Sequence, residues 1–490
     1  MIFKQITPEA AGISSEKVLR FVQMLDNYGF QTHSLIMARG DGIFAEGYWA
    51  PFDAAFNHRM YSVSKSFVAI AVGMAVKDGL LSLDDRFMDY FPEYEDRVDD
   101  LLREATVRDM LMMRSSMNTC HDYWWKDGSD RVAAYFSQKS SQIPGTLYFY
   151  DSAAAFMMNV IVEKLTGKEF LEYMKERVLL DMGFSKESYT LHVPGGYTFG
   201  DSGVMCTARD LLIFAKFVMD GCIWKGERYV DEGCLSDAVS KLSDNRLDTA
   251  VSPLSANGYG YYIWKTPKDG FAFIGMGDQL MLCDPAKEFL FVITSDNQGC
   301  EAVTRALITH ELFEHLIPDI GEMLPENPAA AKALADYLES RRLVCERGAY
   351  DSPLKEAVDD VTYALEPNPA GVTEFILRFD ADGGMLTFTN KSDEWTIPFG
   401  FGENRPGKFP ISKRFGLTAA RYEDGSYDGV TSACFPEPDK LRIRMQMVDT
   451  YFGSLTWTFG FKDDRVTWLC KKTGSRILDG FAGYAVGKKK

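Results

Sequence analysis

The chain has 490 residues, of which 46% are hydrophobic and 25% charged, a composition that excludes a disordered or collagen-like protein. This length exceeds what one hydrophobic core usually supports, so we expect two or three structural units. The formal net charge of −17 argues against a nucleic-acid partner, because an acidic surface repels phosphate groups.

Targeting signals are not evident in the sequence. The first residues, MIFKQITPEAAG, lack the apolar segment that a secretory signal requires, and no run of apolar residues is long enough to span a membrane. The nine cysteines, scattered from Cys120 to Cys470, form no Cys-x-x-Cys pair. These features predict a cytoplasmic protein with reduced thiols and without a membrane partner.

The first elements in chain order are a predicted hairpin and a helix. The stretch SLIMARGDGIFAEGYW predicts two strands that meet at the turn Gly40-Asp41-Gly42. Apolar residues then recur at helical spacing over residues 62–78, and Gly79 is a typical residue just beyond a helix end. From about residue 83 to residue 182 the pattern is mostly helical.

Strand patterns return later in the chain. The segment FAFIGMGDQLMLCDPAKEFLFVITSDN predicts strands at about 271–283 and 288–295 around an Asp284-Pro285 turn, and a helix follows. Early strands, a helical middle, late strands and a last helix predict a mixed α/β fold. We expect an antiparallel sheet flanked by helices and interrupted by a helical insertion.

The last third of the chain has a different pattern. Short alternating segments such as TEFILRF, KLRIRMQM and SLTWTFGF predict an all-β unit, either a barrel or a sandwich. We therefore expect a first domain at residues 1–325 with a helical subdomain at about 84–200, a linker helix at 326–349, and a C-terminal β-rich domain at 350–490.

The pair Ser62 and Lys65 opens the strongly apolar helix of residues 62–78. Residues three apart on a helix lie close enough for their side chains to touch, so Lys65 could act as a base for a Ser62 nucleophile. Alternatively, Ser62 is an N-cap, a favoured role for serine. A lysine in the first turn faces the positive end of the helix dipole, which weakens the capping interpretation. Local sequence leaves the two readings about equally supported.

The third candidate is Tyr150, which immediately precedes a second predicted helix, in the stretch PGTLYFYDSAAAFMMNVIVEKLTG. A tyrosine at a helix N-terminus near an ammonium group could exchange a proton with it. The alternative is that Tyr150 is an ordinary core tyrosine, one of 23 in the chain.

The chain resembles the serine β-lactamase-like family over about residues 5–315. This family includes class C β-lactamases, DD-peptidases, esterases of the same fold and 6-aminohexanoate-dimer hydrolases. The resemblance is carried by motifs in a fixed order: YSVSK, LLSLDDRFMDYFPEY, TVRDMLMMRSSM, PGTLYFYDS, FGDSGVMCTARDLLIFAKF and GYGYYIWK followed by GMGDQ. It implies a β-lactamase/transpeptidase-like fold in which Ser62 is the acylated nucleophile, Lys65 its base and Tyr150 the proton shuttle.

Two departures from the family pattern concern the substrate-binding residues that the resemblance implies, Ser152, Gly275, Met276, Gly277 and Gln279. Where the family often has Tyr-x-Asn, this chain has Tyr150-Asp151-Ser152, so an amide that would orient an amide substrate is missing. Where the family has Lys-Thr-Gly or His-x-Gly, this chain has Ile274-Gly275-Met276-Gly277. A basic residue there would bind a substrate carboxylate, so its absence argues against penicillins and acyl-D-Ala-D-Ala peptides.

These patterns predict a serine hydrolase that cleaves a small-molecule ester or amide without a metal or organic cofactor. Two alternatives stay open: a β-lactamase or D-amino-acid peptidase, and a catalytically weak member of the family that binds a ligand. The edge-strand glycines would let a backbone N–H complete an oxyanion hole with that of Ser62.

Two other stretches have weaker chemical interpretations. HELFEH resembles a zinc-binding helix, but His310 and His315 are five residues apart and would diverge by about 140° on an α-helix, so we expect no metal ligand there. Gly200-Asp201-Ser202-Gly203 could line the cleft, although a simple turn is the preferred interpretation.

Overall fold

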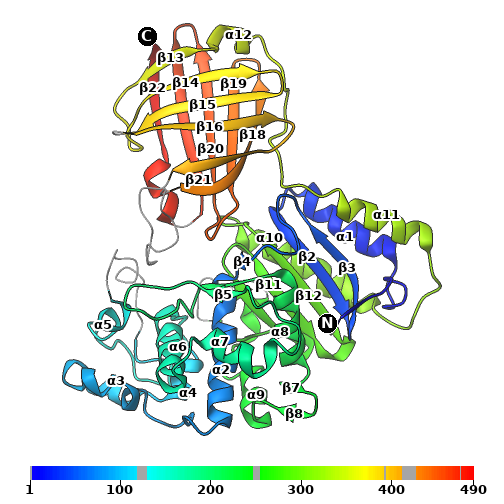
Figure 1. Ribbon diagram of the computed structural model, residues 1–490, viewed down its shortest axis with the longest axis vertical. Helices are drawn as coiled ribbons and strands as arrows, with labels where there is room; N and C mark the ends of the chain where they lie inside the picture. Colours follow the sequence, from blue (N-terminus) through cyan, green and yellow to red (C-terminus); the bar gives the residue numbers. More distant parts are fainter. Residues whose placement is uncertain (1–2, 118–129, 247–253, 391–392, 411–425, 475) are drawn as a thin grey trace. The chain divides into compact units, whose positions relative to one another are not determined.

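The computed structural model describes residues 3–117, 130–246, 254–390, 393–410, 426–474 and 476–490, so Cys120 lies outside the described residues. The chain divides into two compact units, an N-terminal unit that ends at Arg342 and a C-terminal unit that begins at Leu343 (Figure 1). None of the described cysteines forms a disulfide. Within the same residues, no helix combines the length and the apolar character needed to cross a bilayer.

The N-terminal unit is built on a seven-stranded sheet, in which every pair is antiparallel except β1 with β3. The predicted hairpin is confirmed as β2 and β3, with Arg39 opposite Gly42. The sheet contains, in spatial order, β1 (Lys4–Gln5), β3 (Gly42–Tyr48), β2 (Thr32–Arg39), β12 (Phe289–Ser295), β11 (Gln279–Asp284), β10 (Phe271–Gly275) and β9 (Trp264–Lys265).

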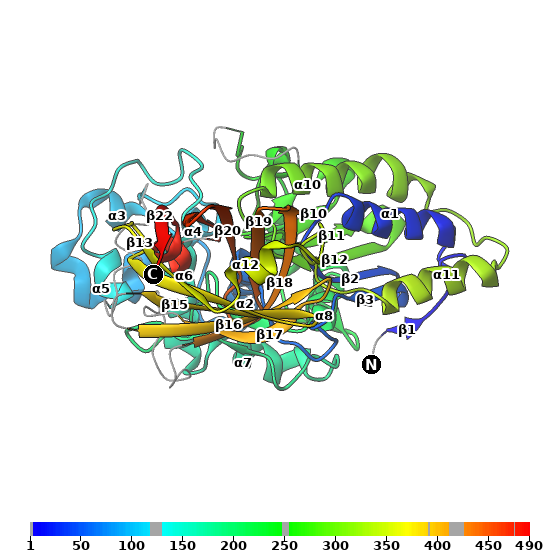
Figure 2. The same ribbon diagram turned by 90° about the horizontal axis from the view of Figure 1, so that it is seen from above.

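Helices cover both faces of this sheet, as Figure 2 shows for α1 (Ser15–Asn27) and α8 (Ala208–Met219). Phe21 of α1 packs edge to face on Phe291 of β12, with ring centroids 5.7 Å apart. On the other face, the ring centroid of Phe214 in α8 lies 5.2 Å from that of Phe273 in β10. Fully buried strands of this kind carry apolar side chains on both faces, which explains their nearly continuous apolar sequences.

The chain leaves the sheet after β3 and returns at β9, and the regular elements of the intervening segment are mostly helices, both within and outside the predicted stretch of about 84–200. Its central helix α2 is apolar on all sides and buried, and Phe67 of α2 stacks on Phe214 at 3.7 Å. The helices between β3 and β9, besides α8, are α2 (Ser64–Lys77), α3 (Asp100–Glu104), α4 (Val107–Leu111), α5 (Arg131–Tyr135), α6 (Ser152–Thr166), α7 (Phe170–Met174) and α9 (Glu232–Ala238). Short strands here form a three-stranded sheet, in the order β4 (His58–Arg59), β6 (Val204–Cys206) and β5 (Tyr189–Thr190), and a two-stranded sheet of β7 (Ile223–Trp224) with β8 (Glu227–Arg228).

The stretch 271–283, which we predicted as one strand, is instead a hairpin of β10 and β11. Gly275 pairs with Gln279, and the turn between them uses positive φ angles at Gly277 (77°) and Asp278 (65°). The apolar pattern continues through both strands because both are buried, so it conceals the turn.

The helix expected within a linker, α11 (Pro328–Glu339), packs inside the N-terminal unit. Its Tyr337 hydroxyl donates to the Asp26 carboxylate of α1 at 2.6 Å. Leu338 lies against the backbone of β3, where a side chain at Gly47 would approach within 2.6 Å of it. This helix therefore contributes to the core of the N-terminal unit and is not a separate spacer.

The segment HELFEH also departs from the prediction. The helix α10 (Glu301–His310) continues into a π-helical turn, η9, at Glu311–Leu316. Backbone hydrogen bonds in a π-helix join residues five apart, so residues with this spacing lie one turn apart. The rings of His310 and His315 are consequently 5.4 Å apart between centroids, and the prediction that they diverge is wrong.

The C-terminal unit is a closed β-barrel, which decides between the barrel and the sandwich that the sequence left open. Ten strands follow one another in hydrogen-bonded order, and a pairing of β16 with β18 closes the sheet. Its elements are α12 (Leu354–Val358), β13 (Val361–Leu365), β14 (Val372–Asp380), β15 (Gly383–Asn390), β16 (Asp393–Phe401), β17 (Arg405–Pro410), β18 (Ser426–Glu437), β19 (Lys440–Met447), β20 (Ser454–Lys462), β21 (Arg465–Thr473) and β22 (Gly483–Lys489).

Candidate active site

Ser62 and Lys65 are in hydrogen-bond contact at the start of the buried helix α2. Ser62 lies in a single 3-10 turn, η1 (Tyr61–Val63), and Lys65 Nζ donates to Ser62 Oγ at 2.8 Å. The N-cap residue of α2 is Val63, and no side chain caps that helix end. Ser62 is partly exposed whereas Lys65 is 1% exposed, so the pair joins a residue at the surface to a buried lysine.

The backbone immediately before Ser62 is strained. Tyr61 has a φ of 45°, in the left-handed region that non-glycine residues rarely occupy. The strained turn is held by its surroundings: Met60 N donates to Val204 O of β6 at 2.9 Å, and the Arg59 guanidinium lies 4.6 Å from the Tyr61 ring centroid. Strain of this kind persists where the surrounding structure fixes it, and it often marks functional sites.

Tyr150 lies beside this pair. Lys65 Nζ is 5.2 Å from the centroid of the Tyr150 ring, so the structure brings the three predicted side chains together. Tyr150 stacks on Trp264 of β9 at 5.8 Å and meets Tyr259 edge to face at 6.3 Å. Sequence reasoning did not single out Trp264 or Tyr259, although both lie in the quoted motif GYGYYIWK.

Asp151 fixes the backbone that carries Tyr150. Its buried carboxylate caps α6 by accepting from Ala153 N at 2.9 Å, and it also accepts from Ser115 Oγ at 3.1 Å. The aspartate that follows Tyr150 is thus engaged in helix capping. Ser152, the first residue of α6, is partly exposed.

Asp201 is a second neighbour of Lys65 that the sequence interpretation undervalued. Lys65 Nζ donates to the Asp201 backbone carbonyl at 2.7 Å. The Asp201 side chain is buried, and its Oδ1 accepts no hydrogen bond from any residue that the structure describes. Burial raises the pKa of Asp201, and the nearby cations Lys65, Arg131 and Arg59 oppose that rise. The stretch Gly200-Asp201-Ser202-Gly203 was the sequence feature that could have pointed to Asp201.

The end of β10 approaches the backbone that leads into Ser62. A side chain at Gly275 would lie 2.4 Å from Met60 O, so only glycine permits this contact. Gly277 and the partly exposed Met276 form the turn that follows. Gln279 lies beneath this turn: its buried amide donates to Met276 O at 2.9 Å and to Ser295 O at 2.6 Å, and accepts from Ser295 N at 3.1 Å.

Asp278 anchors the same turn to α10. Its carboxylate accepts from Arg305 Nε at 2.9 Å and from the Thr304 hydroxyl. Burial raises the pKa of Asp278, while Arg305 and the Thr304 hydrogen bond act in the opposite direction. The turn is therefore held by an internal ion pair, and a basic residue such as the family's lysine is absent from positions 274–277.

Comparisons with known proteins concern the family and the fold of the chain. The family model described as Beta-lactamase matches residues 20–311. A 6-aminohexanoate-dimer hydrolase of Paenarthrobacter ureafaciens is 26% identical over 217 residues, which are 41% of this chain and 55% of that relative. The chain thus spans about half the length of this curated relative.

Two solved structures share the fold. A proposed 6-aminohexanoate-dimer hydrolase from Bacillus anthracis superposes with a TM-score of 0.51 and 16% identity, covering 66% of this chain and 88% of its own. A proposed β-lactamase from Bacteroides dorei superposes with a TM-score of 0.53 and 15% identity, covering 63% of this chain and 98% of its own.

Proposed function

Because the chain belongs to the Beta-lactamase family, a family of hydrolases, we propose that it is a serine hydrolase that cleaves an ester or small amide through an acyl-enzyme on Ser62. The observation that carries this proposal is the 2.8 Å contact between Lys65 Nζ and Ser62 Oγ in a partly exposed residue, with the Tyr150 ring beside Lys65. A nucleophile within hydrogen-bond reach of a base, with a third group next to the base, is the arrangement that acyl transfer requires.

In the proposed reaction, Ser62 Oγ attacks the substrate carbonyl while its proton passes to Lys65 Nζ, the proposed base, along the same N···O contact. The proton then moves to the leaving alcohol or amine by way of Tyr150, and the acyl group remains on Ser62. A water molecule attacks this ester, and the three side chains return to their starting protonation states as the acid leaves.

The developing oxyanion needs backbone donors in a fixed place. The N–H of Ser62 and an N–H at the end of β10 are the proposed donors, because Gly275 allows β10 to approach the turn that carries Ser62. The strained Tyr61 backbone contributes to this arrangement by fixing where the Ser62 N–H points.

The absence of a basic residue at 274–277 supports ester or small-amide substrates over carboxylate-bearing lactams and peptides. Ser152 replaces the family's asparagine, whose amide would orient an amide substrate, and this supports an ester in particular. Nitrocefin should consequently be turned over slowly or not at all, and rapid turnover would favour the β-lactamase alternative.

The proposal is tested by hydrolysis of p-nitrophenyl acetate and butyrate together with labelling by a fluorophosphonate. We expect Ser62→Ala to abolish both, with a loss of at least about 10³-fold in kcat. Ser352→Ala is a matched control, because Ser352 and Lys355 have the same spacing but the Ser352 hydroxyl donates to Pro438 O at 2.8 Å. Equal labelling of wild type and Ser62→Ala would show that the site is misassigned, and failure of every acylating probe would favour the ligand-binding alternative.

A further inference from the structure

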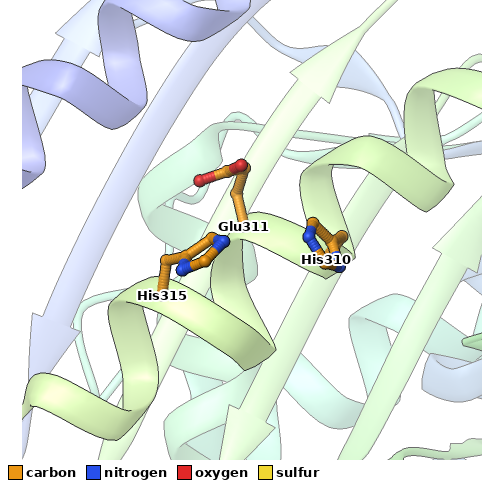
Figure 3. A group of neighbouring side chains, drawn as sticks. All are labelled: His310, Glu311 and His315. Atoms are coloured by element: carbon orange, nitrogen blue, oxygen red, sulfur yellow. The ribbon is translucent and has the colours of Figure 1, made fainter.

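A cluster of three potential metal ligands lies outside the candidate active site, where α10 passes into η9. The ligand atoms of His310, Glu311 and His315 all lie within 4.8 Å of one another. Figure 3 shows the two imidazoles turned toward each other, with the Glu311 carboxylate beside them. Two imidazoles and a carboxylate are the donor set that Zn²⁺ and neighbouring divalent transition metals accept.

The π-helical turn is what creates this cluster. On a continuous α-helix the two histidines would point in directions about 140° apart. Between His310 and Leu316 the chain instead makes hydrogen bonds between residues five apart, which brings His315 back over His310. Single π-turns inside α-helices are rare and occur frequently at functional sites.

The three side chains are available to a ligand. Both histidines are exposed and Glu311 is partly exposed. Within the part of the chain that the structure describes, neither imidazole and no Glu311 carboxylate oxygen takes part in a hydrogen bond or ion pair. Lys17 Nζ donates to the backbone carbonyl of His315 at 2.8 Å and does not occupy its imidazole. The donors needed for a metal are therefore not used by the protein itself.

The distances allow coordination after small side-chain rotations. Ligands at about 2.1 Å from a tetrahedral metal are about 3.4 Å apart, and the ligand atoms of this cluster already lie within 4.8 Å of one another. Exposed side chains can make such a change without disturbing the core. Glu311 and His315 also border a hollow of about 270 Å³, which leaves space for water ligands.

The surrounding charges do not exclude a cation. Lys17 and Arg20 of α1 line the same hollow, but Lys17 is paired with the Asp319 carboxylate. Glu314, in the same turn as Glu311, adds another negative charge. The two positive neighbours, Lys17 and Arg20, are thus matched by two negative ones, Asp319 and Glu314, and the Glu311 carboxylate of the cluster itself adds one negative charge.

We propose that His310, Glu311 and His315 form a binding site for Zn²⁺ or a similar divalent transition metal, with water completing the coordination. The metal would join the last residue of α10 to the π-turn and stabilise that turn. The site contains no proposed catalytic residue, so this inference is independent of the proposed hydrolase function.

The test is calorimetric titration of Zn²⁺ into the full chain after treatment with a chelator, with thermal unfolding measured in parallel. We expect one equivalent to bind and the unfolding temperature to rise on metal addition. His310→Ala and His315→Ala should each weaken binding by more than about tenfold, because even the outer-shell partners of metal ligands contribute 10- to 100-fold. Glu311→Gln should weaken binding and keep the fold.

Two control variants distinguish this site from others. His192→Ala removes an exposed histidine that also has a glutamate neighbour, Glu169 at 3.0 Å, and Cys300→Ser removes an exposed thiol. Both should bind Zn²⁺ like the wild type.

Absence of binding by the wild type would overturn the proposal. Unchanged affinity in a His310→Ala/His315→Ala variant that, in the presence of chelator, unfolds at the wild-type temperature would also overturn it. The Ser62→Ala variant should bind the metal normally, which separates this result from the outcome of the hydrolase test.

Discussion

Two Ser-x-x-Lys pairs in the N-terminal unit have the same spacing and different structures. Ser14 is the N-cap of α1, where its Oγ accepts from Lys17 N at 3.3 Å, and the Lys17 ammonium turns away to Asp319. Ser62 lies in a strained turn before α2, and the buried Lys65 donates directly to its hydroxyl. The spacing permits both arrangements, and the turn geometry and burial decide between them.

The comparison is tested most strongly at the two lysines. Replacing Lys65 with methionine removes the proposed base and should lower kcat for p-nitrophenyl butyrate by about 10²- to 10⁴-fold, the usual contribution of general acid–base catalysis. Lys17→Met removes an exposed ion pair and should leave kcat unchanged. If Lys65→Met kept more than half of the wild-type kcat, Lys65 would not be the base.

Tyr150 distinguishes the second pair from the first: its ring lies 5.2 Å from Lys65 Nζ, whereas no tyrosine ring among the described residues lies in this way beside the Lys17 ammonium. Tyr150→Phe keeps the ring stacked on Trp264 but removes the hydroxyl, so we expect kcat to fall by about 10²-fold with little change in stability. Tyr148→Phe is the control, because Tyr148 packs on the same Tyr259 at 5.4 Å. If Tyr150→Phe kept the same kcat as Tyr148→Phe and the wild type, Tyr150 would have no role in the proposed mechanism.

Asp201, whose backbone carbonyl accepts from Lys65, should make the stability of the protein depend on pH. Burial raises the pKa of Asp201, so the folded protein keeps this proton to a higher pH than the unfolded chain. As the pH rises from about 4, the unfolded chain binds fewer protons than the folded protein, and stability falls. Asp201→Asn lacks this titration, so the wild type should become less stable relative to Asp201→Asn between pH 4 and pH 7.

Denaturant unfolding of both proteins across this pH range measures the effect. Asp319→Asn is the matched control, since its carboxylate is exposed and pairs with Lys17; it should change stability by at most about 1 kcal/mol. A stability difference between wild type and Asp201→Asn that is constant from pH 4 to pH 7 would contradict the account of Asp201.

The smallest expected effect is at Ser14. Removing this N-cap with Ser14→Ala should cost about 0.5–2 kcal/mol of stability and leave esterase activity intact. Urea denaturation and the butyrate assay measure the two quantities. A large loss of activity at unchanged stability would mean that the first pair has a chemical role.

The comparison also shows which features a sequence can predict. Ser62, Lys65 and Tyr150 could be named because each lies in a short motif at the start of a helix. The turn between β10 and β11 was missed because both strands are apolar on both faces, so the periodicity does not change at Gly277. The importance of Asp201 depends on burial among residues distant in sequence, which no local pattern records.

The histidine pair was misjudged for another physical reason. The divergence of His310 and His315 follows from α-helical geometry, and nothing in HELFEH indicates that the backbone changes to π-helical hydrogen bonding. The sequence could not decide between a barrel and a sandwich for the C-terminal unit for a related reason. Alternating strands predict a sheet with one buried face, but closure of that sheet depends on the pairing of β16 with β18.

The most direct test of the central claim is to locate the covalent adduct. The full chain is incubated with a fluorophosphonate, digested, and mapped by mass spectrometry. We predict a single modified peptide with the adduct on Ser62, and no adduct on the peptides that contain Ser14 or Ser352. An adduct on another serine, with the Ser62 peptide unmodified, would contradict the assignment of Ser62 as the nucleophile.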